Sequence, residues 1–93
     1  MTDRQKERIR RAQQEDAIRS MEVLFLQGMG YLFGEGVPRD PDKAVQYITA
    51  AANGGHPEAA RELAFMYAFG NGVEPSQEEW VRWNRKADEL GGK

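Results

Sequence analysis

Apolar and small side chains recur at intervals of three or four residues in four segments of the chain. That spacing places them on one face of a helix, and no segment alternates apolar and polar residues as a half-buried strand would. The pattern therefore predicts an all-α fold. The four stripes are Ala17, Met21, Leu24, Gly28 and Tyr31; Ala44, Tyr47, Ile48 and Ala51; Ala59, Ala60, Leu63, Ala64 and Tyr67; and Trp80, Trp83, Ala87 and Leu90.

Turn and capping residues separate these stripes. Two glycine turns, Gly34–Gly36 and Gly70–Gly72, each follow the first helix of a pair, because glycine adopts left-handed conformations at little cost. Pro41 and Pro57 suit the first position of a helix, where the missing N–H is no loss. Ser76, three residues before a glutamate, is typical of a helix start.

The second half of the chain repeats the first at a distance of 36 residues. We therefore predict a short α-solenoid of two helix–turn–helix repeats, residues 21–56 and 57–93, with residues 1–20 as a charged helical extension or cap. The matched pairs are Tyr31 and Tyr67, Phe33 and Phe69, Gly34 and Gly70, Gly36-Val37 and Gly72-Val73, and Ala51 and Ala87.

The repeated segments resemble the Sel-one-like repeat (SLR) family, a relative of the tetratricopeptide repeat. The resemblance rests on Leu63-Ala-Phe-Met-Tyr67-Ala-Phe-Gly70-Asn-Gly72-Val73 and on Gly28-Met-Gly-Tyr31-Leu-Phe-Gly34-Glu-Gly36-Val37, followed by Asp40-Pro-Asp-Lys43-Ala44. It implies an α-solenoid scaffold that mediates protein–protein contacts and is common in bacterial proteins. The chain departs from the family pattern at Gln27, Ala64, Ser76 and Trp80.

Composition narrows the class of protein further. The chain has 93 residues, 40% of them hydrophobic and 30% charged, and it contains no cysteine. No apolar run reaches the roughly 18 residues that a membrane span needs, and no apolar stretch follows the N-terminus as in a secretory signal. We therefore expect a cytoplasmic protein of one small domain.

The net charge of −2 is unevenly distributed. Residues 1–11 contain five basic and two acidic side chains, whereas the rest of the chain is acidic. Such a basic segment can contact nucleic acid, but charge runs more commonly form solvated faces. Nucleic-acid binding through this segment is therefore a minor alternative.

The residues needed for catalysis are missing from the sequence. His56 is the single histidine, and a metal site usually needs three or four histidine, cysteine or carboxylate ligands. The glycines lack the spacing and the lysine of a phosphate-binding loop. Adjacent acidic residues such as Glu78 and Glu79 diverge by about 100° on a helix. We therefore predict that the protein is not an enzyme, has no cofactor and uses His56 as a structural turn residue.

Large apolar residues occupy the helix face opposite the two matched tyrosines. Residues two before and two after each tyrosine lie roughly 160° away from it, and these positions hold Met29, Phe33, Phe65 and Phe69. Such a patch is typical of a protein-binding site, although the N-terminal helix could cover it or it could belong to the core. We predict that these four residues bind a partner protein.

The small number of repeats leaves the ends of the stack to be explained. Repeat arrays generally need three units or capping elements, so residues 3–20 are expected to act as a cap and Trp80 and Trp83 to allow association at the other end. The predicted function is a protein-interaction module, such as an adaptor, an inhibitor or an immunity-type binder. The alternative is a small homo-oligomeric structural protein.

Overall fold

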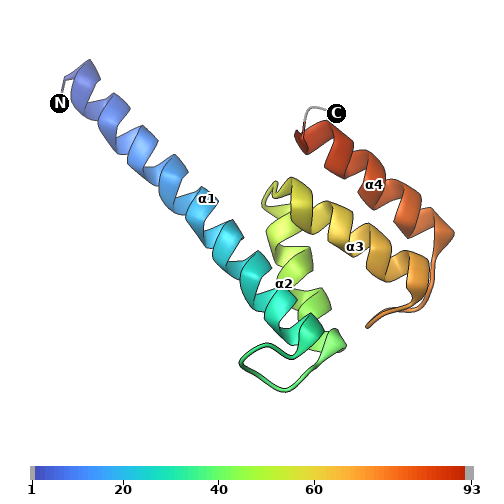
Figure 1. Cartoon of the computed structure of the whole chain (residues 1–93). Coiled ribbons are helices and arrows are strands. Elements are labelled where there is room, and N and C mark those ends of the chain that lie inside the picture. Colours follow the sequence, from blue (N-terminus) through green and yellow to red (C-terminus); the bar gives the residue numbers. More distant parts are fainter. Residues whose placement is uncertain (1, 92–93) are drawn as a thin grey trace.

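The structure, a computed structural model, describes residues 2–91, with the side chains of residues 9–17 excepted. Within these residues the chain forms four helices and no strand (Figure 1): α1 (Asp3–Phe33), α2 (Pro41–Asn53), α3 (Pro57–Phe69) and α4 (Gln77–Gly91). Helix α1 packs on α2 and α3 packs on α4, while α2 and α3 join the two pairs. The all-α solenoid of two repeats predicted from the sequence is confirmed.

Capping residues and glycines define several of the helix ends. Asp40 accepts a hydrogen bond from the Lys43 amide and starts α2, with Pro41 at the first helical position. Gly34 and Gly70 end the first helix of each repeat in the left-handed conformation, with φ of 72° and 68°. The two repeats therefore share their turn geometry as well as their sequence.

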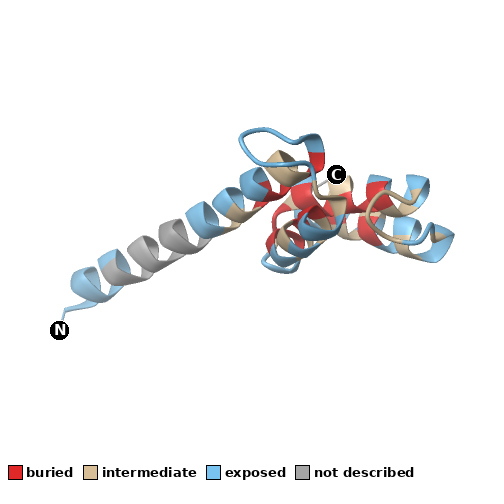
Figure 2. Ribbon diagram, turned by 90° about the horizontal axis from the view of Figure 1, so that it is seen from below, coloured by how far each residue is buried: buried red, intermediate tan, exposed pale blue. Residues whose placement is uncertain are grey.

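Small residues allow the paired helices to approach closely. A Cβ atom added at Gly28 would lie 2.5 Å from Ile48 Cγ1, so a side chain at this position of α1 would collide with α2. In the second repeat Ala64 takes the equivalent position and is fully buried. The buried residues lie where the helices pack together (Figure 2). They are Phe25, Leu32, Ala44, Ile48, Ala51, Ala52, Ala59, Ala60, Leu63, Ala64, Met66, Trp83 and Ala87.

The N-terminal part of α1 projects away from the repeats (Figures 1 and 2). The helix begins with a capping box between Thr2 and Gln5 and runs without interruption to Phe33. Residues 2–8 and 18–20 are exposed. The leading segment is thus an extension of α1, and its described side chains do not cover the end of the stack as the expected cap would. We call residues 3–20 the arm.

Candidate protein-interaction face

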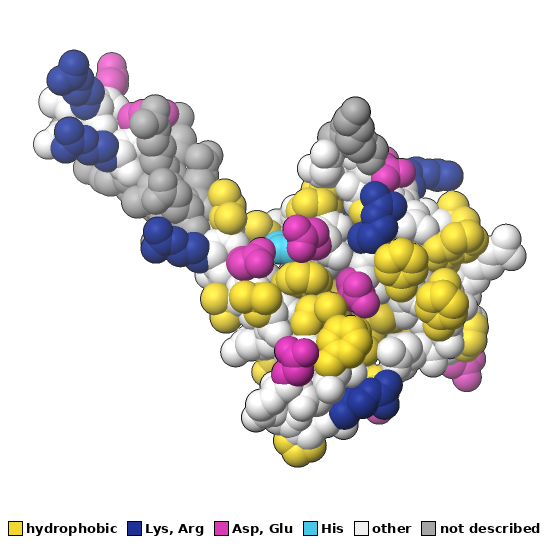
Figure 3. Space-filling model, viewed as in Figure 1, with side chains coloured by type: hydrophobic (Ala, Val, Ile, Leu, Met, Phe, Trp, Pro, Cys, Tyr) yellow, Lys and Arg dark blue, Asp and Glu magenta, His cyan; other side chains and the backbone are white. Residues whose placement is uncertain are grey.

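The four apolar residues predicted to bind a partner lie on α1 and α3, the first helices of the two repeats. The side chains of Phe33, Phe65 and Phe69 are 61%, 45% and 79% exposed, whereas Met29 is half-buried and packs against the core. We call these four residues the aromatic face. Neither α2 nor α4 contains phenylalanine. Hydrophobic side chains, drawn in yellow, gather on the side of the molecule that Figure 3 shows.

A groove runs beside the aromatic face between α1, α3 and the end of α4. It encloses about 600 Å³ and is lined on one side by Phe25 and Met29 of α1. Glu62 of α3 lines the other side. Phe65 and Phe69 lie three and seven residues after Glu62 on the same helix. Residues at these intervals share a helix face, so the groove leads onto the aromatic face. The rest of its lining is Pro57, Glu58, Arg61, Ala87 and Gly91.

His56 connects the two repeats beside this groove. Its Nδ1 accepts a hydrogen bond from the Ala59 amide at 3.0 Å and so caps the start of α3. Because Nδ1 accepts, the neutral ring has its proton on Nε2, which donates to a carboxylate oxygen of Glu22 at 2.6 Å. The ring also stacks on Phe25, with centroids 4.7 Å apart. Sequence analysis anticipated a structural histidine but not these contacts, since Glu22 is 34 residues away.

Three acidic residues, which we call the acidic rim, flank the groove. Glu22 on α1 and Glu58 on α3 occupy equivalent positions of the two repeats, and Glu62 lies one turn beyond Glu58. Burial of the Glu62 side chain raises the pKa of its carboxyl group, because desolvation disfavours the charged form. Among the described residues, neither Glu58 nor Glu62 has a hydrogen-bond or ion-pair partner. Glu58 and Glu62 are therefore unpaired within the described residues, whereas Glu22 accepts the hydrogen bond from His56.

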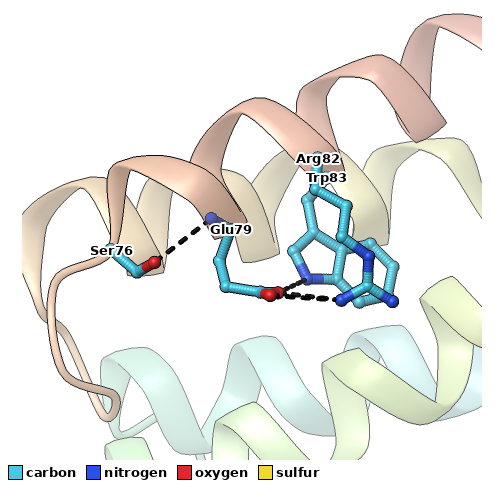
Figure 4. Close-up of polar contacts among 4 residues, drawn as sticks. All are labelled: Ser76, Glu79, Arg82 and Trp83. Atoms are coloured by element: carbon cyan, nitrogen blue, oxygen red, sulfur yellow. Dashed lines mark hydrogen bonds and ion pairs between the residues drawn. The ribbon is translucent and has the colours of Figure 1, made fainter.

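Trp80 and Trp83, the two residues predicted to allow association at the far end of the stack, differ in exposure. Trp83 is only 4% exposed, and its indole Nε1 donates to Glu79 Oε2 at 3.1 Å (Figure 4). The Arg82 guanidinium lies over the ring, 5.1 Å from its centroid, and also contacts Glu79. Trp83 therefore fills the interior of repeat 2, and association at this end of the stack stays a prediction that would involve Trp80. Trp80 is 38% exposed.

Three polar residues join α3 to α4 in repeat 2. Asn84 and Asp88 occupy the positions that the fully buried Ile48 and Ala52 occupy in repeat 1. Arg61 donates to Asn84 Oδ1 at 3.0 Å and to Asp88 Oδ1 at 2.7 Å. Sequence analysis missed this trio, although a comparison of the two repeats at a distance of 36 residues reveals both substitutions.

The described residues contain no group of three or more His, Cys, Asp or Glu side chains placed to hold a metal ion. In the same part of the chain, no helix is long and apolar enough to cross a membrane. What the described residues do assemble beside the groove is an apolar centre with acidic residues at its border.

Comparisons with known proteins agree with this architecture. The sequence matches the Sel1 repeat over residues 26–56 and 57–91. The chain is similar to a protective antigen of uropathogenic Escherichia coli with an SLR fold (41% identity, TM-score 0.74), covering 76% of this chain and 15% of that one. It is also similar to a Sel1 repeat protein from Oxalobacter formigenes (37% identity, TM-score 0.73), covering 76% of this chain and 21% of that one. No curated protein matches the chain.

The chain spans less than a quarter of the length of either solved relative. The match to the repeat includes both helix pairs and leaves out the whole arm. Sel1 repeats generally mediate protein–protein interactions, and their fold is generally a scaffold without enzymatic activity. On the strength of both repeat matches and both structural neighbours, the chain belongs to the Sel1 repeat family.

Proposed function

We propose that this protein is a non-catalytic module that holds a partner protein against its aromatic face, as an adaptor, an inhibitor or an immunity-type binder does. The observation that supports this proposal best is the exposure of Phe33 and Phe69, at 61% and 79%, at equivalent positions of the two repeats. A solvated helix face ordinarily holds charged or amide side chains at such positions. Here both repeats present an aromatic ring.

The apolar area is large enough to support binding. Taking about 200 Å² for each phenylalanine, the three exposed rings present on the order of 350 Å², which is comparable with the functional patches of typical monomers. At about 25 cal/mol/Å², covering this area would yield about 9 kcal/mol before the costs of association are subtracted. Phe25 and Met29 would form the floor beneath a bound segment rather than its main contacts.

The experiment compares the wild-type protein with the double variant F33E/F69E. The control variant V81E places one charge on α4, where Val81 is 42% exposed and lies outside the aromatic face. Each protein is first checked for cooperative unfolding by circular dichroism. Immobilised proteins are then used to isolate partners from the native cell, and the affinity of the purified partner is measured by calorimetry.

We expect a partner that V81E binds as tightly as the wild type does and that F33E/F69E binds at least 100-fold more weakly. That factor corresponds to about 1.4 kcal/mol for each phenylalanine, the loss typical of residues at the centre of an interface. Equal affinity of the wild type and F33E/F69E for every partner would contradict the proposal.

A further inference from the structure

The first helices of the two repeats carry matching stripes of side chains. Each stripe begins with an acidic residue and ends with a phenylalanine, and its members are three or four residues apart. That spacing keeps a stripe within about 60° of its helix surface. The stripes are Glu22, Leu26, Met29 and Phe33 on α1, and Glu58, Glu62, Phe65 and Phe69 on α3.

The two stripes border one groove, with their acidic ends together. Helices α1 and α3 run in the same direction (Figure 1), and the groove between them is lined by Met29 from α1 and by Glu58 and Glu62 from α3. At the start of α3, His56 Nε2 lies 2.6 Å from a carboxylate oxygen of Glu22. Figure 3 shows acidic side chains on both sides of the histidine, beside hydrophobic ones. The groove therefore has an acidic end and an apolar end.

The acidic end favours a ligand with positive charge. Glu58 and Glu62 lie one turn apart, and neither forms a hydrogen bond or an ion pair with the described residues. Arg61 also lines the groove, but its guanidinium donates to Asp88 at 2.7 Å, so its charge is already balanced. Burial raises the pKa of Glu62 by penalising its charged form. A cation placed beside these two carboxylates would therefore be attracted to them, whereas an acidic ligand would be repelled.

The walls of the groove favour a helical ligand over an extended one. They consist of side chains on the faces of α1 and α3, whose backbone groups are paired inside those helices. The described part of the chain offers no strand edge, so the backbone groups of an extended ligand would lose water without gaining partners. A helix satisfies its own backbone groups and can lay an apolar face into a groove of this kind.

We propose that the groove binds an amphipathic helix of a partner protein, which carries Lys or Arg about two helical turns from a pair of large apolar side chains. This proposal rests on the function proposed above, because it specifies the partner of the same face. Glu58 and Phe65 are seven residues apart, as are Glu62 and Phe69, and the distance along the axis is about 10 Å. Residues seven apart in the ligand also share a helix face, so its basic side chain reaches the acidic end when its apolar pair covers the phenylalanines.

A displayed peptide library tests this chemistry on the full-length chain. The peptides are helical frames of about 20 residues, with two residues drawn from Leu, Met and Phe four positions apart. All amino acids are allowed at the positions about seven residues before and after this pair, so both orientations of the ligand are represented. The library is selected separately on the immobilised wild type and on its variants, each checked for cooperative unfolding.

The charge-reversed variant is E58K/E62K, and its matched control is E78K/E89K. The control makes the same change of charge on α4, where Glu78 and Glu89 border a different hollow of the surface. Glu58 and Glu78 each lie in the first turn of their helix, so both variants lose a favourable contact with a helix N-terminus. A difference between the two variants therefore reports on the groove.

On the wild type and on E78K/E89K we expect Lys and Arg to be enriched at least about threefold at the varied positions. On E58K/E62K the preference should reverse to Asp and Glu. A basic peptide selected on the wild type should bind E58K/E62K at least about tenfold more weakly, bind E78K/E89K with unchanged affinity, and lose affinity as salt is added. If E58K/E62K does not unfold cooperatively, E58Q/E62Q replaces it and should show no preference for basic residues.

The proposal is overturned if the wild type selects no peptide, or if it selects peptides without basic residues at these positions. It is also overturned if E58K/E62K keeps the preference of the wild type. The failure of the two proposals is distinguishable. A partner protein whose affinity depends on Phe33 and Phe69 but not on Glu58 and Glu62 would support the proposed function alone. If no ligand depends on Phe33 and Phe69, both proposals fail.

Discussion

Replacing His56 by alanine would test how strongly the two repeats are coupled. His56 makes three contacts that involve both repeats: the cap at the Ala59 amide, the hydrogen bond to Glu22 and the stack on Phe25. The side chain is 8% exposed, so H56A also removes packed atoms between α1 and α3. We expect this variant to lower the free energy of unfolding more than a typical capping substitution does.

The magnitude follows from the separate contacts. Loss of a helix cap costs about 1 kcal/mol, and loss of an aromatic stack costs roughly 0.5–1.5 kcal/mol. The contact with Glu22 contributes about 0.5–1 kcal/mol, because the Glu22 side chain is 51% exposed to solvent. The expected loss is therefore roughly 2–4 kcal/mol out of the 5–15 kcal/mol typical of a small domain. For a domain of this size, that loss lowers the Tm by roughly 15 °C.

Urea unfolding at pH 7, followed by circular dichroism, measures this loss. The variant H56N is the matched control, because asparagine caps helices well but neither stacks on Phe25 nor reaches Glu22 as a ring does. It should recover about 1 kcal/mol relative to H56A. A double-mutant cycle with E22Q should give a coupling of about 0.5–1 kcal/mol. A loss below about 0.5 kcal/mol in H56A, or equal losses in H56A and H56N, would refute this account.

Three further substitutions test other parts of the structure. G28A should lower the free energy of unfolding, measured in urea, by about 1 kcal/mol, because the collision with Ile48 outweighs the better helix propensity of alanine. A gain in stability would contradict the close approach of α1 to α2. R61A should lower the free energy of unfolding by about 1 kcal/mol. A double-mutant cycle of R61A with D88N should show a coupling energy between the two residues, and additive effects would mean that their ion pair contributes nothing to stability. Burial raises the pKa of Glu62 above its ordinary value of 4.5, so its ionisation destabilises the folded chain as the pH rises through that raised pKa. E62Q should therefore be more stable than the wild type at pH 7 and lose this advantage below pH 4.5, and equal stability at both pH values would contradict the raised pKa.

The helices and turns could be predicted because each depends on residues close together in the sequence. The stripe from Met21 to Tyr31 specifies a helix by its spacing, and Gly34 and Gly70 end their helices in a conformation that glycine adopts easily. The internal repeat further predicted that two similar units stack on each other, because each unit has an apolar face to bury. The local spacing of apolar residues and the 36-residue internal repeat were therefore sufficient to predict the fold.

The contacts around His56 and Arg61 could not be predicted in the same way. Glu22 is 34 residues before His56, and Asp88 is 27 residues after Arg61. No local pattern indicates which of the many exposed acidic residues a given histidine or arginine contacts. The different exposure of Trp80 and Trp83 could not be predicted for a related reason. Both lie on one apolar stripe, only three residues apart, and the spacing did not reveal that Trp83 is 4% exposed and Trp80 38%.

Comparison of the two repeats shows which positions the stacking of repeats covers and which it leaves exposed. Ala59, Leu63 and Met66 of α3 are buried, with at most 2% of each side chain exposed. Their equivalents on α1, which has no preceding repeat in the structure, are Val23 at 52% exposure, the exposed Gln27 and the half-buried Gly30. These positions are therefore the ones that stacking covers.

The phenylalanines do not follow that rule. Phe69 is 79% exposed although a repeat precedes α3, and Phe33 is 61% exposed although a repeat follows α1. Because a neighbouring repeat leaves this face open on both helices, repeats added at either end of the stack would leave it open too. A partner protein would therefore have to reach this face from the side of the stack, and the proposed function depends on that geometry.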